Sequence, residues 1–403
     1  MDKEMAARPL LSERELQALF KPIGVADGLP GRVYSDQACW DVEREKLFRQ
    51  DWFAVGFASD APMTGDLKPI TAAGWELVLI RQPDGSVRCF HNICRHRGTK
   101  LVREARNVRK ISCGWHCWTY ELDGRLNSTP LIAGPRTTGH EDFDRAQLGL
   151  IEVRSAVWND IVFVNIDGKA RSFEDFSARL TQLFARYEPA GYDLAHPSGG
   201  TEEAGLDINW KLYHEGGLEG YHIPFVHPAL SQPAMYKTES DDDVFTSVTA
   251  GVPKYTRLGT LAGLAADALG LNPAAAAAIA RGEDPPYTIC FVTPTVIVAA
   301  WPEAFITTLL RPVSATRTTV RRKMYFIGPG ATSTQAAPAR QRNVDIWEQV
   351  TSEDAAYSMG VQSLSAQRQE IGMSTRFSPY WEDAVHHFQQ IIARRAYGAA
   401  AAA

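Results

Sequence analysis

The sequence lacks the features that mark membrane, secreted and nucleic-acid-binding proteins. No apolar run reaches the roughly 18 residues that a membrane-spanning helix needs. The first twenty residues mix charges through an apolar pattern and lack the charged-then-apolar order of a signal peptide. The formal net charge is only −5, which argues against nucleic acid or an anionic membrane as the main partner. We therefore expect a cytoplasmic protein whose 403 residues are enough for two domains.

Internal repeats and nucleotide-binding glycine motifs are also missing. Gly328-Pro329-Gly330 reads as a loop and lacks the strand-then-helix setting of a dinucleotide site. If the protein uses electrons from NADH, the flavin that receives them must therefore lie on a separate protein. The basic residues at 321–323 fall in a strand-like stretch, where we expect a solvated face.

Cysteine is scarce, and two of the six form a distinctive pattern with histidine. Cys94, His96, Cys113 and His116 give C-x-H-x16-C-x2-H, in which each of two short loops supplies one thiolate and one imidazole. Zinc takes the same ligand types, but zinc fingers usually pair Cys with Cys and His with His. In a Rieske [2Fe-2S] cluster, two cysteines hold one iron and two histidines hold the other. We favour this cluster and expect buried thiols at the four remaining cysteines, Cys39, Cys89, Cys117 and Cys290.

Short strands separated by turn residues fill the region from Trp52 to Asp167. Strand-like segments at 75–80 and 87–91 flank a Pro-Asp-Gly turn and lead into the first cluster loop. This region predicts a small all-β unit, followed by a helical linker at 172–187.

The second half mixes strands with helices. Segments 288–300 and 305–310 are β-rich, and 318–327 is expected to pair with the latter. Ser378-Pro379 is a candidate N-cap for a final helix, in which apolar residues recur at helical spacing from Trp381 to Ile392. The alanine-rich tract 261–280 reads equally well as a surface insertion or as a flap over a pocket.

Two histidines after the linker form a second candidate metal site. His222 and His227 are five residues apart, and Pro224 between them is expected to break a helix that begins near Asp207. A carboxylate would complete the two-histidine, one-carboxylate set that holds Fe(II). Glu219, three residues before His222, is placed one helical turn back, where it could orient the imidazole. Taken alone, this histidine pair is weak evidence.

Together, the two motifs resemble the Rieske-type non-haem iron oxygenases: the ring-hydroxylating alpha subunits and their quaternary-amine relatives. The resemblance rests on the cysteine-histidine pattern and on Asn209-Trp210-Lys211 followed by Glu219-x2-His222-x4-His227. It implies an α+β fold, with an N-terminal helical arm at 1–40, a Rieske domain at 41–168 and a catalytic domain at 169–403. In the catalytic domain an antiparallel sheet would wrap a long C-terminal helix in a helix-grip arrangement.

The resemblance also implies ligands and an assembly. Cys94, His96, Cys113 and His116 would hold the [2Fe-2S] cluster, and His222, His227 and Asp354 a mononuclear Fe(II), with Glu353 as the second candidate for the carboxylate. In this family the acid that matches Glu219 also bonds a cluster histidine of a neighbouring subunit, which implies a homotrimer. Electrons would enter at His96 and His116 and reach the iron through Glu219.

The implied function is that of a terminal oxygenase, which uses O2 and electrons from a separate flavin reductase, with or without a ferredoxin. Glu at position 219 resembles the branch that oxidises carnitine and similar quaternary amines, by hydroxylation followed by N-dealkylation or C–N cleavage. Aromatic ring hydroxylation and a pure electron-transfer role remain the alternatives. Aromatic side chains could enclose a quaternary ammonium group, although each is equally suited to a core; the candidates are Trp301, Phe305, Phe291 and Tyr213.

Three departures from the family pattern leave the ligands intact. Family members commonly have Gly at the position of Cys117, Pro-Tyr in place of Gly114-Trp115 and Asn in place of Gly216. We expect the Cys117 side chain to point away from the cluster.

Overall fold

The computed structural model describes residues 10–185, 199–227, 236–239, 244–250, 287–301, 304–326 and 331–398. The chain forms two compact units, one built mainly from Phe48–Arg179 and one that combines the residues before Phe48 with the C-terminal half. The alanine-rich tract 261–280 lies outside the described residues. None of the described helices combines the length and the apolar character needed to cross a membrane.

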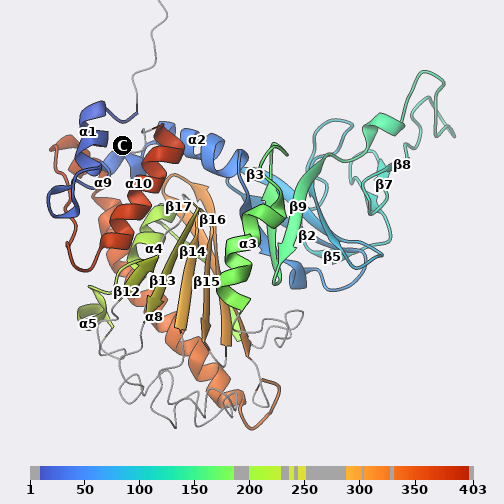
Figure 1. Cartoon of the computed structure of the whole chain (residues 1–403). Helices are drawn as coiled ribbons and strands as arrows, with labels where there is room; N and C mark the ends of the chain where they lie inside the picture. Colours follow the sequence, from blue (N-terminus) through green and yellow to red (C-terminus); the bar gives the residue numbers. More distant parts are fainter. Residues whose placement is uncertain are drawn as a thin grey trace, which may run out of the picture. The chain divides into compact units, whose positions relative to one another are not determined.

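Between Trp52 and Asp167 the first unit is built of strands with short helical turns, as expected (Figure 1). A seven-stranded sheet has the order β1-β10-β9-β4-β3-β2-β5, and a three-stranded sheet has the order β6-β7-β8. The buried side chains of Phe90, Ile111, Trp118 and Tyr120 pack with Cys94 and Cys113 in one core. The strands are β1 Phe53–Phe57, β2 Asp66–Ala72, β3 Trp75–Arg81, β4 Val87–His91, β5 Arg106–Asn107, β6 Ile111–Ser112, β7 Thr119–Tyr120, β8 Leu126–Ser128, β9 Glu152–Trp158 and β10 Ile161–Asn165. Helix α3, Phe173–Phe184, follows as the expected linker.

The second unit is built on a seven-stranded antiparallel sheet with the order β11-β17-β16-β15-β14-β13-β12. The predicted hairpin is confirmed, since Phe305 of β16 pairs with Tyr325 of β17. The strands are β11 Gly199–Leu206, β12 Tyr236–Glu239, β13 Phe245–Ala250, β14 Tyr287–Val292, β15 Val296–Trp301, β16 Ala304–Ser314 and β17 Arg317–Phe326. Besides α2, described below, the described α-helices of this unit are α1 Glu13–Leu19, α4 Trp210–Gly217, α5 Ile223–Val226, α8 Ala337–Ser363, α9 Ser365–Glu370 and α10 Asp383–Tyr397. Helix α8 runs along one face of the sheet (Figure 1). This arrangement confirms the α+β prediction.

The N-terminal residues pack into this second unit. Helix α2, Gln37–Glu43, ends in Glu43, whose carboxylate forms a fully buried ion pair with Lys211 at 2.7 Å. Trp210 and Tyr397 donate to the same carboxylate. At Gly31 the backbone passes so close that an added Cβ would lie 2.0 Å from the carbonyl oxygen of Ser365. Removal of either partner of the Glu43–Lys211 ion pair would leave the other as an uncompensated charge in the interior and would strongly destabilise the fold.

The final helix begins later than the sequence indicates. Its N-cap is Glu382, not Ser378. The backbone N–H of Ser378 donates to the Glu382 carboxylate, and the Ser378 hydroxyl accepts from the Trp381 N–H, so these residues form a turn ahead of α10. The apolar periodicity is confirmed, since Ala384, Val385, Phe388, Ile391 and Ile392 are all buried.

Candidate cluster and iron sites

The two cluster loops share one backbone design. The Cys94 N–H donates to the Thr99 carbonyl and the Cys113 N–H to the Trp118 carbonyl, each at 2.8 Å. Four residues after each cysteine, a left-handed residue donates back to the cysteine carbonyl: Gly98, with φ of 73°, and Cys117, with φ of 55°. Glycine is the residue that adopts this conformation without strain. The left-handed conformation of Cys117 is thus one that the glycine expected from the family pattern would adopt without strain.

The predicted cluster ligands divide into a buried pair and an exposed pair. The thiols of Cys94 and Cys113 interact and are each 2% exposed. The rings of His96 and His116 are exposed, with centroids 4.5 Å apart. Trp118 stacks on His96 at 4.7 Å. Two thiols on the inner side and two imidazoles on the outer side match a cluster whose two irons have different ligands.

Electrostatics in the first loop also fit a bound metal cluster. Burial raises the pKa of Cys94, so a neighbouring cation is needed to keep it as a thiolate. The Tyr120 hydroxyl lies 3.4 Å from the Cys94 sulfur and accepts from the Arg95 N–H at 3.0 Å. Cys117 is exposed, so the expectation of a buried thiol is wrong there, whereas Cys39, Cys89 and Cys290 are buried.

The loop that carries the histidine pair begins earlier than expected. Helix α4 starts after its N-cap Asn209 and ends at Gly217, so it does not reach His222. Glu219 therefore lies in a loop, and its carboxylate accepts from the backbone N–H of Tyr221 and of His222. Pro224 occupies the first turn of the short helix α5, a position that suits proline, and does not break a helix.

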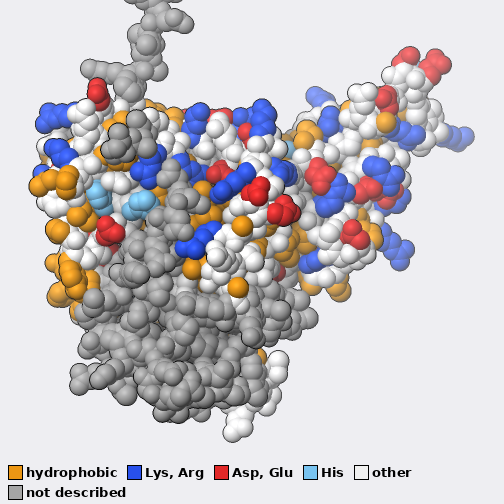
Figure 2. Space-filling model, viewed as in Figure 1, with side chains coloured by type: hydrophobic (Ala, Val, Ile, Leu, Met, Phe, Trp, Pro, Cys, Tyr) orange, Lys and Arg blue, Asp and Glu red, His pale blue; other side chains and the backbone are white. Residues whose placement is uncertain are grey.

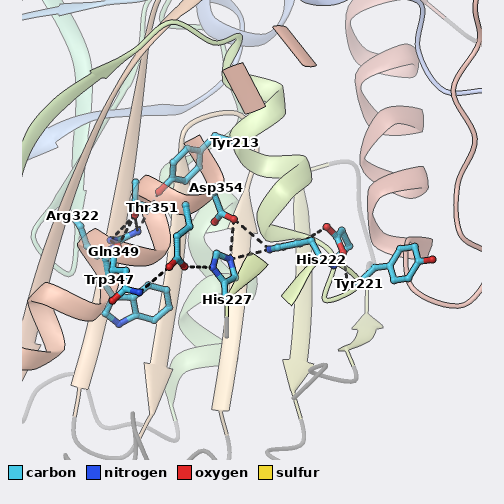
Figure 3. A network of polar contacts seen from close by, with 11 residues as sticks. Tyr213, Tyr221, His222, His227, Arg322, Trp347, Gln349, Thr351 and Asp354 are labelled. Atoms are coloured by element: carbon cyan, nitrogen blue, oxygen red, sulfur yellow. Dashed lines mark hydrogen bonds and ion pairs between the residues drawn. The ribbon is translucent and has the colours of Figure 1, made fainter. Parts of the chain in front are cut away.

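This loop brings the two histidines to Asp354 of α8 (Figure 3). The His227 Nε2 lies 2.9 Å from the Asp354 Oδ1, the His222 Nε2 lies 3.4 Å from it, and the two Nε2 atoms are 3.2 Å apart. An octahedral ion with bonds of about 2.1 Å places adjacent ligand atoms about 3.0 Å apart. The three side chains therefore fit one face of an octahedral metal site.

Each histidine is held from behind by a second carboxylate. Glu219 bonds the His222 Nδ1, and the Glu353 Oε2 lies 2.6 Å from the His227 Nδ1. Gln349 donates to the other oxygen of Glu353 at 2.8 Å. The structure thus places the carboxylate of Glu353, the second candidate for the iron ligand, at the Nδ1 of His227 and not at the Nε2 atoms that face Asp354. The sequence carries no signal for this contact, because its partners are 126 residues apart.

The charges at this site favour a cation. Burial by itself would lower the pKa of His222, but hydrogen bonds to Asp354 and Glu219 raise it to about 9. The pKa of Asp354 is lowered, because hydrogen bonds to both histidines outweigh burial. The three carboxylates thus stabilise positive charge between the imidazoles, which protons or a divalent ion can supply.

The structure also bears on the basic residues at 321–323 and on the aromatic side chains considered for a quaternary ammonium site. Arg322 and Lys323 are buried, so the solvated face expected at 321–323 is wrong for them. Phe291 and Phe305 are buried, and they pack on His214 and on Tyr325 respectively. The side chain of Trp301 lies outside the described residues.

Comparison with known proteins identifies both units. The family model described as "Ring hydroxylating alpha subunit (catalytic domain)" matches residues 184–398, and that described as "Rieske [2Fe-2S] domain" matches residues 51–138. The glycine betaine monooxygenase oxygenase subunit of Chromohalobacter salexigens is 34% identical over 215 residues, 53% of this chain and 46% of that protein. The alpha subunit of 2-aminobenzenesulfonate 2,3-dioxygenase from Alcaligenes sp. is also 34% identical, over 53% of this chain and 54% of its own.

The matched region thus spans about half the length of these curated relatives. A solved quaternary ammonium Rieske monooxygenase has the same fold, with a TM-score of 0.74 and 21% identity over 94% of this chain and 98% of its own. The family model of the catalytic domain covers more than half of the chain. This protein belongs to the ring-hydroxylating oxygenase alpha-subunit family, with a Rieske [2Fe-2S] domain and a catalytic domain of the kind that binds mononuclear iron.

Proposed function

We propose that this chain is the terminal oxygenase of a multicomponent system that hydroxylates a quaternary amine or betaine, with N-dealkylation or C–N cleavage as the outcome. The observation that carries the proposal is the convergence of His222, His227 and Asp354, with ligand atoms within 4.8 Å of one another. An electron carrier alone has no need of this second site. When bound, the cluster would supply single electrons and the iron would activate dioxygen.

The residues have separate roles in this proposal. Cys94 and Cys113 hold the inner side of the cluster, and the exposed His96 and His116 form the side at which electrons are exchanged. His222, His227 and Asp354 would hold the iron, which would supply dioxygen activation. Glu219 orients His222 and completes the electron path. We assign residues 1–40 to an N-terminal segment, 41–168 to the Rieske domain and 169–403 to the catalytic domain.

Two groups of relatives support the proposed substrate classes. Glycine betaine monooxygenase oxygenase subunits are among the similar curated proteins, and this supports a quaternary amine. The equal identity to an aminobenzenesulfonate dioxygenase subunit favours ring hydroxylation of an aromatic acid as the second candidate.

An assembly of identical chains, a homotrimer, is part of the proposal. Large hydrophobic side chains are exposed on the segment that carries Glu219, with Tyr221 at 49% and Phe225 at 76%, and Tyr380, which contacts Trp381, is 66% exposed. Tyr221 stacks on Trp381 with ring centroids 6.2 Å apart. Hydrophobic side chains also gather along the left edge of the face shown in Figure 2. Contiguous exposed apolar surface of this kind is typical of protein interfaces. A partner subunit here would bring its cluster near Glu219, and a separate reductase would supply the electrons.

Iron analysis and oxygen uptake test the proposal. The purified chain is expected to hold three irons, two in the cluster and one at the triad of His222, His227 and Asp354. The variant His227→Ala is expected to hold only two. A panel of betaines and aromatic acids, assayed by substrate-stimulated oxygen uptake, separates the two substrate classes. Two irons in the unaltered protein and no stimulated uptake would leave only the electron-carrier alternative.

Glu219→Gln tests the electron path separately. With Fe(II) supplied in excess, it is expected to hold both metals and keep the reduced-cluster spectrum, while coupled turnover is lost. Near-normal coupled turnover would exclude the bridging role of Glu219.

A further inference from the structure

Arg322 lies where the central sheet meets both helices that lead to the iron ligands. It belongs to β17 and is 5% exposed. Its Nε donates to the hydroxyl of Thr308 on β16 at 3.0 Å, and the two residues are paired in the sheet. Because paired residues share one face of a sheet, this contact fixes the side on which the guanidinium group projects.

The guanidinium group binds one turn of α8. It donates to the Trp347 carbonyl at 3.1 Å and, through both terminal nitrogens, to the Thr351 hydroxyl at 3.2 Å. It also lies over the Trp347 ring, 5.0 Å from the centroid. Thr351 precedes Asp354 by three residues, less than one helical turn. The contact therefore holds the part of α8 that presents Asp354 and Glu353 to the histidines.

The same group binds α4. One terminal nitrogen donates to the Tyr213 hydroxyl at 3.2 Å (Figure 3). Tyr213 lies in the helix that leads directly into the loop of Glu219 and His222. A single side chain thus ties the carrier of Asp354 to the carrier of His222 and both to the sheet.

We propose that Arg322 is a positioning residue of the iron site, which sets the separation between Asp354 and His222 without touching the metal. This inference rests on the proposed function, because it requires that His222, His227 and Asp354 bind Fe(II). The triad distances of 2.9 to 3.4 Å leave little room for displacement, because metal bonds are short. Arginine suits the task, since its planar fork presents five donors in fixed directions, whereas a lysine has one ammonium group.

The test compares Arg322→Met and Arg322→Lys with a matched control in the full-length protein. Arg321→Met makes the same change at the next residue of β17, which projects to the opposite face. Fe(II) affinity is measured by anaerobic titration, and ligand geometry by the paramagnetic resonance spectrum of the Fe(II)–nitric oxide adduct. We expect Arg322→Met to weaken Fe(II) binding roughly 10- to 100-fold and to alter the adduct spectrum. We expect a smaller loss for Arg322→Lys, none for Arg321→Met and an unchanged cluster absorption in all three.

Two milder variants keep the test decisive if Arg322→Met fails to fold. Thr351→Val removes the link to α8, and Tyr213→Phe removes the link to α4. Each is expected to weaken Fe(II) binding and shift the adduct spectrum in the same direction as Arg322→Lys. Wild-type affinity and an unchanged spectrum in both, or in Arg322→Met, would overturn the positioning role while leaving the proposed function intact. Failure of the unaltered protein to bind Fe(II) at the triad would overturn both.

Discussion

Glu353 offers the most direct test of how the iron site is built. Its Oε2 lies 2.6 Å from the His227 Nδ1, and its side chain is 26% exposed. A charge-assisted hydrogen bond contributes about 1.5–3 kcal/mol when buried, and exposure reduces this. Loss of such a partner behind a ligand histidine typically costs about 10- to 100-fold in metal affinity. We expect Glu353→Gln to weaken Fe(II) binding about tenfold, because the amide oxygen can still accept the bond, and Glu353→Ala to weaken it toward 100-fold.

Anaerobic Fe(II) titration of protein with an intact cluster measures this effect. Glu348→Gln is the matched control, since Glu348 is an exposed carboxylate on the same helix α8. The control is expected to bind Fe(II) as the unaltered protein does. The His227 ring should also become less well fixed, which the nitric oxide adduct spectrum would register.

Two results would refute the reasoning. Equal affinities for Glu353→Ala and the unaltered protein would show that the contact does not support His227. Complete loss of iron in Glu353→Ala together with retained iron in Asp354→Ala would show that Glu353 is the ligand and that the triad is assigned incorrectly.

Three further predictions concern stability. Lys211→Met leaves Glu43 buried and unpaired and is expected to lower the unfolding free energy by about 3–5 kcal/mol in chemical denaturation, with recovery when Glu43→Gln is added. Gly98→Ala introduces a side chain at φ of 73° and should destabilise the protein by about 1 kcal/mol, whereas Gly114→Ala, which also meets open space but lies outside the left-handed region, should not; equal melting temperatures would contradict this. Burial raises the pKa of Glu215 from 4.5 to about 7, so the folded state binds the proton more tightly and stability falls as the pH rises from about 4.5 to about 7. Glu215→Gln is expected to flatten the melting temperature over that range, and an unchanged pH profile would exclude Glu215 as its source.

Local patterns in the sequence were sufficient for the family and for several strands and helices, but not for every helix boundary. Alternation and turn residues located the strands around the cluster loops, and the periodicity of α10 identified its buried face even though its start was misplaced. The start of α10 was misplaced because both Ser378 and Glu382 are near the beginning of the helix and either could precede its first turn. In the structure the Ser378 N–H donates to the Glu382 carboxylate and the helix begins after Glu382, which helix propensity does not predict. The left-handed position of Cys117 is likewise a property of the folded loop.

The sequence by itself identified the candidate metal ligands, because ligand chemistry resides in residue types and in short spacings such as C-x-H and H-x4-H. Only the tertiary structure decided which carboxylate joins the histidines and which one supports them. Asp354 and Glu353 are neighbours in the chain, but the position of α8 directs Asp354 to the Nε2 atoms and Glu353 to the Nδ1 of His227. The tertiary structure also decided that Arg322 and Lys323 are buried and that Glu43 pairs with Lys211. Contacts between segments more than a hundred residues apart depend on how the helices pack on the sheet, and no local pattern encodes that packing.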